Sequence, residues 1–184
     1  MNDKNLSEKF KLAENLSLKK EYEKSIINYK EILEFNPDFI PALNNIGLCY
    51  EYLNQFNDAE KYYSRCFFLK PDDIIFLNNL SNIYLKQKKF ELALPLLKKS
   101  LEKNQDQIRV INLTVMCLID LNKREEAEKF SNDKLKFFSD NRLLNKLHGR
   151  NLIYLNKHKQ GLNFLKKGTG FLELEGKNIR ILSY

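Results

Sequence analysis

A period of 34 residues runs along the chain and constrains its fold more than any other feature. At this step, one place in each unit holds a large apolar residue and another a small one: Leu33, Phe67, Leu101 and Leu135, and Ala59, Ala93 and Ala127. Such recurrence indicates repeated units, and a unit of this size cannot bury its hydrophobic face alone. The period therefore predicts an array in which neighbouring units pack against one another.

Each unit is predicted to contain two helices. Apolar residues recur at spacings of three and four on either side of a short polar break, such as Asn54-Gln55. Pro37 and Pro71 should end a unit, because proline cannot donate to a helix ladder. The residue that follows is an aspartate in the first two units, and the same step leads to two more, which we expect to cap the next helices: Asp38, Asp72, Asp106 and Asp140. The expected class is all-α.

The residue pattern of the second unit identifies a possible family. Its large, small and aromatic places are Leu43, Ile46-Gly47, Tyr50, Ala59, Tyr63, Cys66 and Pro71. This pattern resembles the tetratricopeptide repeat, a helical hairpin of 34 residues. The resemblance implies a right-handed α-solenoid of about five hairpins over residues 1–169. The implied repeats are 6–39, 40–73, 74–107, 108–141 and 142–169. The match weakens in the fourth unit, where Thr114-Val115 replaces the Leu-Gly pair.

The last segment, residues 170–184, departs from the helical pattern. FLELE and IRIL alternate on either side of a turn at Gly176-Lys177-Asn178, which predicts a short β-hairpin. Two strands alone are marginally stable. We therefore expect the hairpin to cap the end of the array, or else to belong to something larger.

Composition argues against several classes of function. No apolar run approaches the roughly 18 residues of a membrane span, and the first ten residues are charged, so a cytoplasmic protein without membrane contact is expected. Three cysteines without a CxxC pair indicate neither disulfides nor zinc, and we expect them to be small buried residues. Catalytic or metal-ligand spacings do not occur. The chain is predicted to be no enzyme and to need no cofactor or metal, although it could be an accessory module of a larger enzyme.

Asparagines form the most distinctive pattern in the expected binding surface. In the tetratricopeptide family, the first helix of each hairpin lines a concave groove. The asparagines on these helices are Asn44, Asn45, Asn78, Asn79, Asn82 and Asn112. A carboxamide both donates and accepts, so such a ladder can hold the backbone of an extended peptide. The predicted partner is therefore a protein or peptide segment. The alternative is that these asparagines only solvate the groove.

Basic residues concentrate towards the C-terminal end. Residues 1–71 carry 10 Lys/Arg and 11 Asp/Glu, whereas residues 140–184 carry 9 and 3. Lys146 and Arg150, one turn apart, could grip an acidic group, with Arg109 one unit away and Met116 in the apolar floor of the groove. Nucleic-acid or anion binding at this end is the alternative function, because clustered cations gain affinity by displacing counterions. A solvated lysine-rich face would explain the same residues without any ligand.

Overall fold

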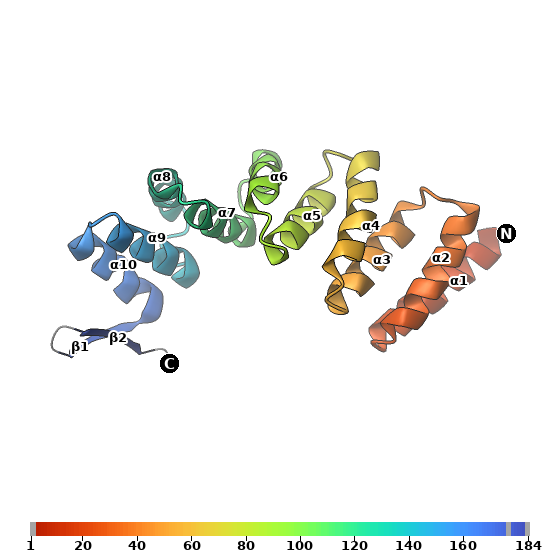
Figure 1. Cartoon of the computed structure of the whole chain (residues 1–184), viewed down its shortest axis with the longest axis horizontal. Helices are drawn as coiled ribbons and strands as arrows, with labels where there is room; N and C mark the ends of the chain where they lie inside the picture. Colours follow the sequence, from red (N-terminus) through yellow and green to blue (C-terminus); the bar gives the residue numbers. More distant parts are fainter. Residues whose placement is uncertain (1–2, 176–177, 183–184) are drawn as a thin grey trace. The chain divides into compact units, whose positions relative to one another are not determined.

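The computed structural model describes residues 3–175 and 178–182, and the side chains of residues 5–170. Its described part holds ten α-helices and two strands (Figure 1). The helices are α1 (Asp3–Leu18), α2 (Tyr22–Phe35), α3 (Ile40–Tyr52), α4 (Phe56–Leu69), α5 (Ile74–Lys86), α6 (Phe90–Lys103), α7 (Ile108–Asp120), α8 (Arg124–Leu135), α9 (Arg142–Tyr154) and α10 (His158–Thr169). The expected all-helical repeat of ten helices is confirmed. Among these helices, none is both long and apolar enough to cross a membrane.

The turn inside each helical hairpin repeats with the same period as the sequence. In the described chain, the non-glycine residues with positive φ lie 34 residues apart, with φ between 57° and 63°: Lys20, Asn54, Lys88, Asn122 and Asn156. Each follows the first helix of a hairpin in the left-handed conformation that commonly ends a helix. The period thus fixes backbone conformation as well as side-chain type.

The contacts divide the chain into two units, Met1–Leu96 and Leu97–Tyr184, here called unit 1 and unit 2. The division falls within α6, which is a single helix although Pro95 lies inside it. Proline removes one ladder hydrogen bond without ending this helix.

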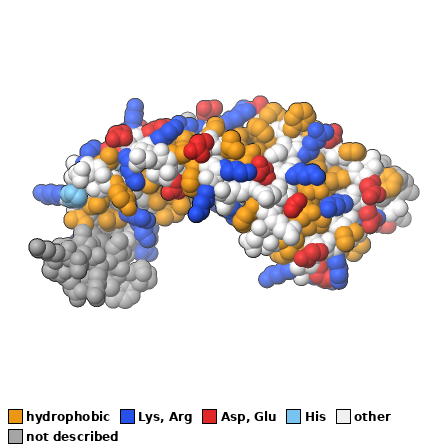
Figure 2. Space-filling model, viewed as in Figure 1, with side chains coloured by type: hydrophobic (Ala, Val, Ile, Leu, Met, Phe, Trp, Pro, Cys, Tyr) orange, Lys and Arg blue, Asp and Glu red, His pale blue; other side chains and the backbone are white. Residues whose placement is uncertain are grey.

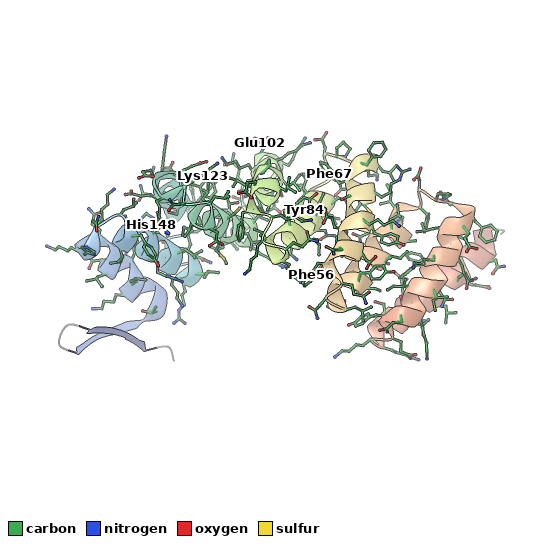
Figure 3. All side chains as sticks on the ribbon, in the orientation of Figure 1. Phe56, Phe67, Tyr84, Glu102, Lys123 and His148 are labelled. Atoms are coloured by element: carbon green, nitrogen blue, oxygen red, sulfur yellow. The ribbon has the colours of Figure 1, made fainter. Side chains whose placement is uncertain are left out.

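The core of unit 1 combines aliphatic, aromatic and small residues from successive hairpins. Tyr29 and Tyr63 are fully buried. Phe56, Phe67 and Tyr84, labelled in Figure 3, pack against the cluster formed by Ala59, Tyr63, Leu80 and Ile83. A Cβ added at Gly47 would lie 2.8 Å from the Tyr63 ring, so only a residue without a side chain lets the ring approach this closely. The aromatic residues of the second repeat, residues 40–73, are therefore mainly packing residues.

The three cysteines are buried and free, as expected. Burial raises the pKa of the Cys66 thiol to about 12. A thiol with such a pKa holds almost no thiolate at neutral pH, which makes Cys66 chemically inert.

In unit 2, α9 and α10 approach each other through glycines. A Cβ added at Gly149 would lie 2.8 Å from the carbonyl oxygen of Gly161, and one at Gly161 would lie 2.8 Å from that of Gly149. Gly168 lies similarly against the backbone of Lys146. The two helices therefore meet backbone to backbone, and a methyl group at either contact would push them apart.

The expected aspartate caps do not form. The N-cap residues of α3, α5, α7 and α9 are Phe39, Asp73, Gln107 and Asn141, each one residue after the expected aspartate. The carboxylate of Asp38 instead accepts two hydrogen bonds from Arg65 of α4, at 2.6 and 2.9 Å. A charged partner from the neighbouring helix thus takes the oxygen that was expected to cap α3.

The two strands follow α10. Strands β1 (Phe171–Glu175) and β2 (Asn178–Leu182) pair antiparallel, with Phe171 opposite Leu182 and Glu175 opposite Asn178. The side chains of this segment lie outside the described ones. Its role as a cap stays a prediction.

Candidate functional site

Hydrogen-bonded asparagines join three helices of unit 1. Asn79 Nδ2 of α5 donates to Asn44 Oδ1 of α3 at 2.9 Å, and Asn44 Nδ2 donates to Asn45 Oδ1 at 3.4 Å. Asn45 Nδ2 in turn donates to the Tyr29 hydroxyl of α2 at 2.9 Å. Burial raises the pKa of Tyr29 to about 12, so this hydroxyl stays protonated. We call these four residues the asparagine relay.

A second polar cluster centres on Glu51, at the C-terminal end of α3. Its carboxylate accepts hydrogen bonds from Asn82 Nδ2 at 2.8 Å, Lys86 Nζ at 2.9 Å and the Tyr63 hydroxyl at 3.2 Å. Asn82 and Lys86 belong to α5, and Tyr63 belongs to α4. One carboxylate therefore ties three helices together, and we call this group the Glu51 cluster.

The relay and the Glu51 cluster give α3 and α5 a common polar face, with apolar side chains beside it. Ile75, 58% exposed, precedes Asn79 by four residues and Asn82 by seven, so the three lie along one side of α5. A carboxamide has two N–H hydrogens. Within the described contacts Asn79 uses one of them and keeps the other for a ligand. This α3/α5 face could therefore contact both the backbone and an apolar side chain of a bound segment.

The structure changes how the asparagine ladder must be interpreted. Asn44, Asn45, Asn79 and Asn82 do lie on adjacent helices, but they bond to protein groups and are not independent rungs. Asn78 is half-buried next to them. The amides are thus held in place before any ligand arrives.

Asn112 does not lie on an open groove. It holds the place in its repeat that Asn44 and Asn78 hold in theirs, but only 6% of it is exposed. Its Nδ2 donates to Asn141 Oδ1 at 3.4 Å, at the N-cap of α9. The prediction was wrong for this residue, because a cap side chain that the repeat pattern does not specify draws the amide inward.

A pocket of about 120 Å³ opens between α7 and α9 in unit 2. It brings together Met116 and Arg150, two of the predicted residues, and is lined as well by Ile119, Asp120, Leu147, Asn151 and Tyr154. Lys146 is half-buried and Arg109 is exposed, and neither lines this pocket. The predicted pair of Lys146 and Arg150 is therefore not a joint anion site in this pocket.

Tyr154 forms a wall of the α7/α9 pocket. The Arg124 guanidinium lies over its ring, 4.2 Å from the centroid, and the Arg124 backbone oxygen accepts from Asn151 Nδ2 at 2.7 Å. Asn151 is fully buried, and its Oδ1 has no hydrogen-bond partner among the described residues. Arg124 therefore contacts both Tyr154 and Asn151.

Sequence reasoning missed several residues of these two surfaces, among them Glu51, Asn151 and Tyr154. A signal for part of them was present, since the 34-residue step joins Tyr52, Lys86, Asp120 and Tyr154. This place ends each first helix on the same side as Ile75 and Asn79. The missing clue was that the end of the first helix lines these surfaces as its middle does.

A larger cleft of about 430 Å³ lies between α6 and α8. Leu101 and Phe130 form its apolar part, and a salt bridge of 2.6 Å between Lys98 and Glu126 lies at its edge. Charges of both signs line it, and such exposed pairs contribute little. No cluster of metal-ligating side chains occurs in the part of the chain that the structure describes.

Two profiles of the tetratricopeptide repeat family match the chain, over residues 40–73 and 76–105. The tetratricopeptide repeat-containing protein trd-1 of Caenorhabditis elegans is 26% identical over 125 residues, which cover 68% of this chain and 16% of that protein. The chain thus spans about a sixth of that relative's length.

Solved structures share the fold at low sequence identity. MamA (residues 41 to the end) from Desulfovibrio magneticus RS-1 has a TM-score of 0.83 at 16% identity, covering 91% of this chain and 94% of that one. YrrB, described as a TPR protein with an unusual peptide-binding site, has a TM-score of 0.79 at 19% identity, covering 87% and 82%. These likenesses concern the fold alone. The two profile matches, at the places where the structure has repeated hairpins, show that the chain contains tetratricopeptide repeats.

Proposed function

We propose that this chain is a non-catalytic protein-interaction module that binds an extended segment of a partner protein. The binding surface would be formed by the first helices of the hairpins, through the α3/α5 face in unit 1 and the α7/α9 pocket in unit 2. The observation that carries the proposal is the α3/α5 face, where hydrogen bonds hold amides in place beside an exposed isoleucine. Preorganised polar groups next to apolar surface suit an extended peptide.

The comparisons support this proposal at the level of the family. Helical-repeat proteins present extended surfaces to partners. YrrB, which shares the fold, is itself described as having a peptide-binding site. For a chain that spans a small part of its relative trd-1, work as an accessory module of a larger assembly fits the same proposal.

We propose one binding surface within each unit, and we do not require the two to be continuous. The repeats are those expected from the sequence, with residues 1–169 as the repeat region and residues 170–184 as a C-terminal cap. The location we propose is the cytoplasm.

A capture experiment with matched variants tests the proposed surface. Ile75→Lys and Met116→Lys place a charge on the α3/α5 face and in the α7/α9 pocket, at residues 58% and 40% exposed. Phe68→Lys and Phe137→Lys make the same kind of change on more exposed side chains outside these surfaces. We expect the first two variants to lose partner proteins about tenfold or more from a nuclease-treated lysate of the source cell. The last two variants should retain them.

Two outcomes would contradict the proposal. Equal capture by all four variants would place the partner elsewhere on the molecule. Nuclease-sensitive capture that Lys146→Glu abolishes would instead support the basic-end alternative, because phosphate contacts depend on such cations.

A further inference from the structure

The α7/α9 pocket combines apolar walls with a single unpaired cation. Met116, Ile119 and Leu147 provide the apolar surface. Arg150 is exposed at the rim and has no ion-pair or hydrogen-bond partner among the described residues, whereas Arg124 is engaged over Tyr154. This arrangement differs from the α3/α5 face, where Glu51 pairs with the cation Lys86. In unit 2 the free guanidinium remains available to a ligand.

The volume of the pocket limits what can enter it. A cavity of about 150 Å³ can hold a benzene ring. At about 120 Å³, the α7/α9 pocket admits one apolar side chain of the size of leucine or methionine. Several side chains or a nucleobase with its sugar would not fit inside. The pocket therefore selects a single apolar anchor.

Charge determines what lies next to that anchor. A free guanidinium offers up to five N–H donors, and its strongest common partner is a carboxylate. Asp120, across the rim on α7, disfavours a second carboxylate on its own side. The acidic group should therefore sit beside the apolar anchor on the α9 side. The excess of basic residues over residues 140–184 favours the same approach.

We infer that the α7/α9 pocket is a specificity subsite for a partner segment in which a leucine-sized apolar residue is followed by an acidic residue. The apolar side chain fills the space between Met116 and Leu147, and the carboxylate binds Arg150. This inference rests on the proposed function and names the partner chemistry for one of its two surfaces.

The chain offers a selective reporter for this subsite. It contains two methionines, Met1 and Met116, so carbon-13 methyl labelling of methionine places one of two NMR signals in the pocket. Met116→Leu assigns that signal by removing it. The probes are three short peptides: acetyl-Ser-Leu-Asp-Ser-amide, the same peptide with Lys in place of Asp, and the same peptide with Ser in place of Leu.

We expect the Leu-Asp peptide to shift the Met116 methyl signal at millimolar concentration, with about tenfold weaker effects from the other two peptides. Arg150→Glu should reverse the preference between the Asp and Lys peptides, because it reverses the charge at the rim. Lys159→Glu, the same charge change on an exposed residue of α10, should leave the shifts unchanged.

A Met116 signal that ignores all three peptides, or shifts equally with each, would overturn the inferred specificity. So would an Arg150→Glu variant with unchanged preference. If Ile75→Lys and Met116→Lys still abolish partner capture in that case, the proposed binding surface stands and only this subsite fails. A single-stranded RNA oligonucleotide that shifts the signal more strongly than the Leu-Asp peptide would also overturn the inference.

Discussion

His148 of α9 is a buried histidine in unit 2. Its Nδ1 lies 2.7 Å from Ser131 Oγ, and its ring packs edge-on against Phe164 with centroids 4.5 Å apart. The single hydroxyl proton of Ser131 goes to the Ala127 carbonyl, so His148 Nδ1 carries a proton and donates to Ser131. Burial, opposed by the field of Glu128, lowers the pKa of His148.

A lowered pKa makes unit 2 sensitive to acid. Below the ordinary histidine pKa of about 6.5, the unfolded chain binds a proton that the folded chain resists, so the free energy of unfolding falls as the pH falls. We expect the urea midpoint to decrease more between pH 7.5 and 5.5 in the wild type than in His148→Leu. Equal decreases in the two proteins would show that His148 does not titrate in this way.

Lys88 occupies a backbone conformation that suits other residues better. Its φ is +59°, while Asn54 and Asn122 hold the equivalent turn in two other hairpins. A left-handed conformation costs an ordinary side chain about 1–2 kcal/mol, and glycine avoids most of that cost at some loss of entropy.

Lys88→Gly should therefore raise the free energy of unfolding by about 0.5–1 kcal/mol, measured by urea denaturation. Lys61→Gly, in the interior of α4, is the matched control and should lower it by about 1 kcal/mol. If Lys88→Gly lowered stability as Lys61→Gly does, the left-handed assignment of this turn would be wrong.

The residues of the two proposed surfaces show which side-chain properties can be predicted from the sequence. The 34-residue period predicts that Asn45 and Asn79 hold equivalent places on first helices. It predicts the same for Met116 and Arg150. The bonds among the amides did not follow, because they depend on Tyr29 and Glu51, which a periodic pattern assigns to packing and to the solvent. Hydrogen-bond partners depend on the distance between neighbouring helices, which residue type alone does not specify.

At the scale of helices, Glu51 joins α3 to α4 and α5. Removing its carboxylate leaves the half-buried Asn82 and the buried Tyr63 without an acceptor and Lys86 without its ion pair. Because leaving a polar group unpaired costs about 1–3 kcal/mol, Glu51→Ala should lower the free energy of unfolding by that amount. Glu34→Ala, at an exposed place on α2, should change it by less than about 0.5 kcal/mol. Similar values for both variants would argue against the Glu51 cluster.

The α9–α10 pair depends on backbone contact at glycine. Gly161→Ala places a methyl group against the Gly149 carbonyl oxygen and the Ile153 side chain, both within 2.9 Å. Since a backbone oxygen cannot rotate away, the helices must separate, and overpacking of this kind costs about 1–3 kcal/mol. Thermal unfolding should show a lower melting temperature than for Asn163→Ala, an exposed change on the same helix. A melting temperature equal to that of the wild type would contradict this close packing.

Helix ends were harder to predict than helices. The period located each hairpin, and the polar break at Asn54-Gln55 coincides with a left-handed turn. The N-caps lie one residue after the expected aspartates. At α3 the expected residue, Asp38, binds Arg65 of α4 instead. A polar side chain at a helix end can hydrogen-bond either to the local backbone or to a neighbouring helix. The sequence does not show which of these partners is nearer.

At the scale of the whole molecule, the repeats made the fold easy to predict from the sequence. The function was harder to predict. In a periodic sequence, the residue pattern that predicts each pair of helices occurs several times. A departure such as Thr114-Val115 in one repeat therefore does not prevent the prediction. A binding site differs from repeat to repeat. In unit 1 the first helices carry paired amides, and in unit 2 they enclose a pocket with a free arginine. Basic, acidic and hydrophobic side chains are interspersed on the face drawn in Figure 2, so charge type alone does not mark either surface. The contrast between the two surfaces comes from single residues such as Tyr154, which only the structure brings together.

Hydrogen–deuterium exchange of the chain with its captured partner would show which helices the partner covers. We expect slower exchange on binding in α3, α5, α7 and α9, whose side chains form the two proposed surfaces, and little change in α4 and α8. Protection confined to α4, α6 and α8, with the first helices unchanged, would contradict this expectation.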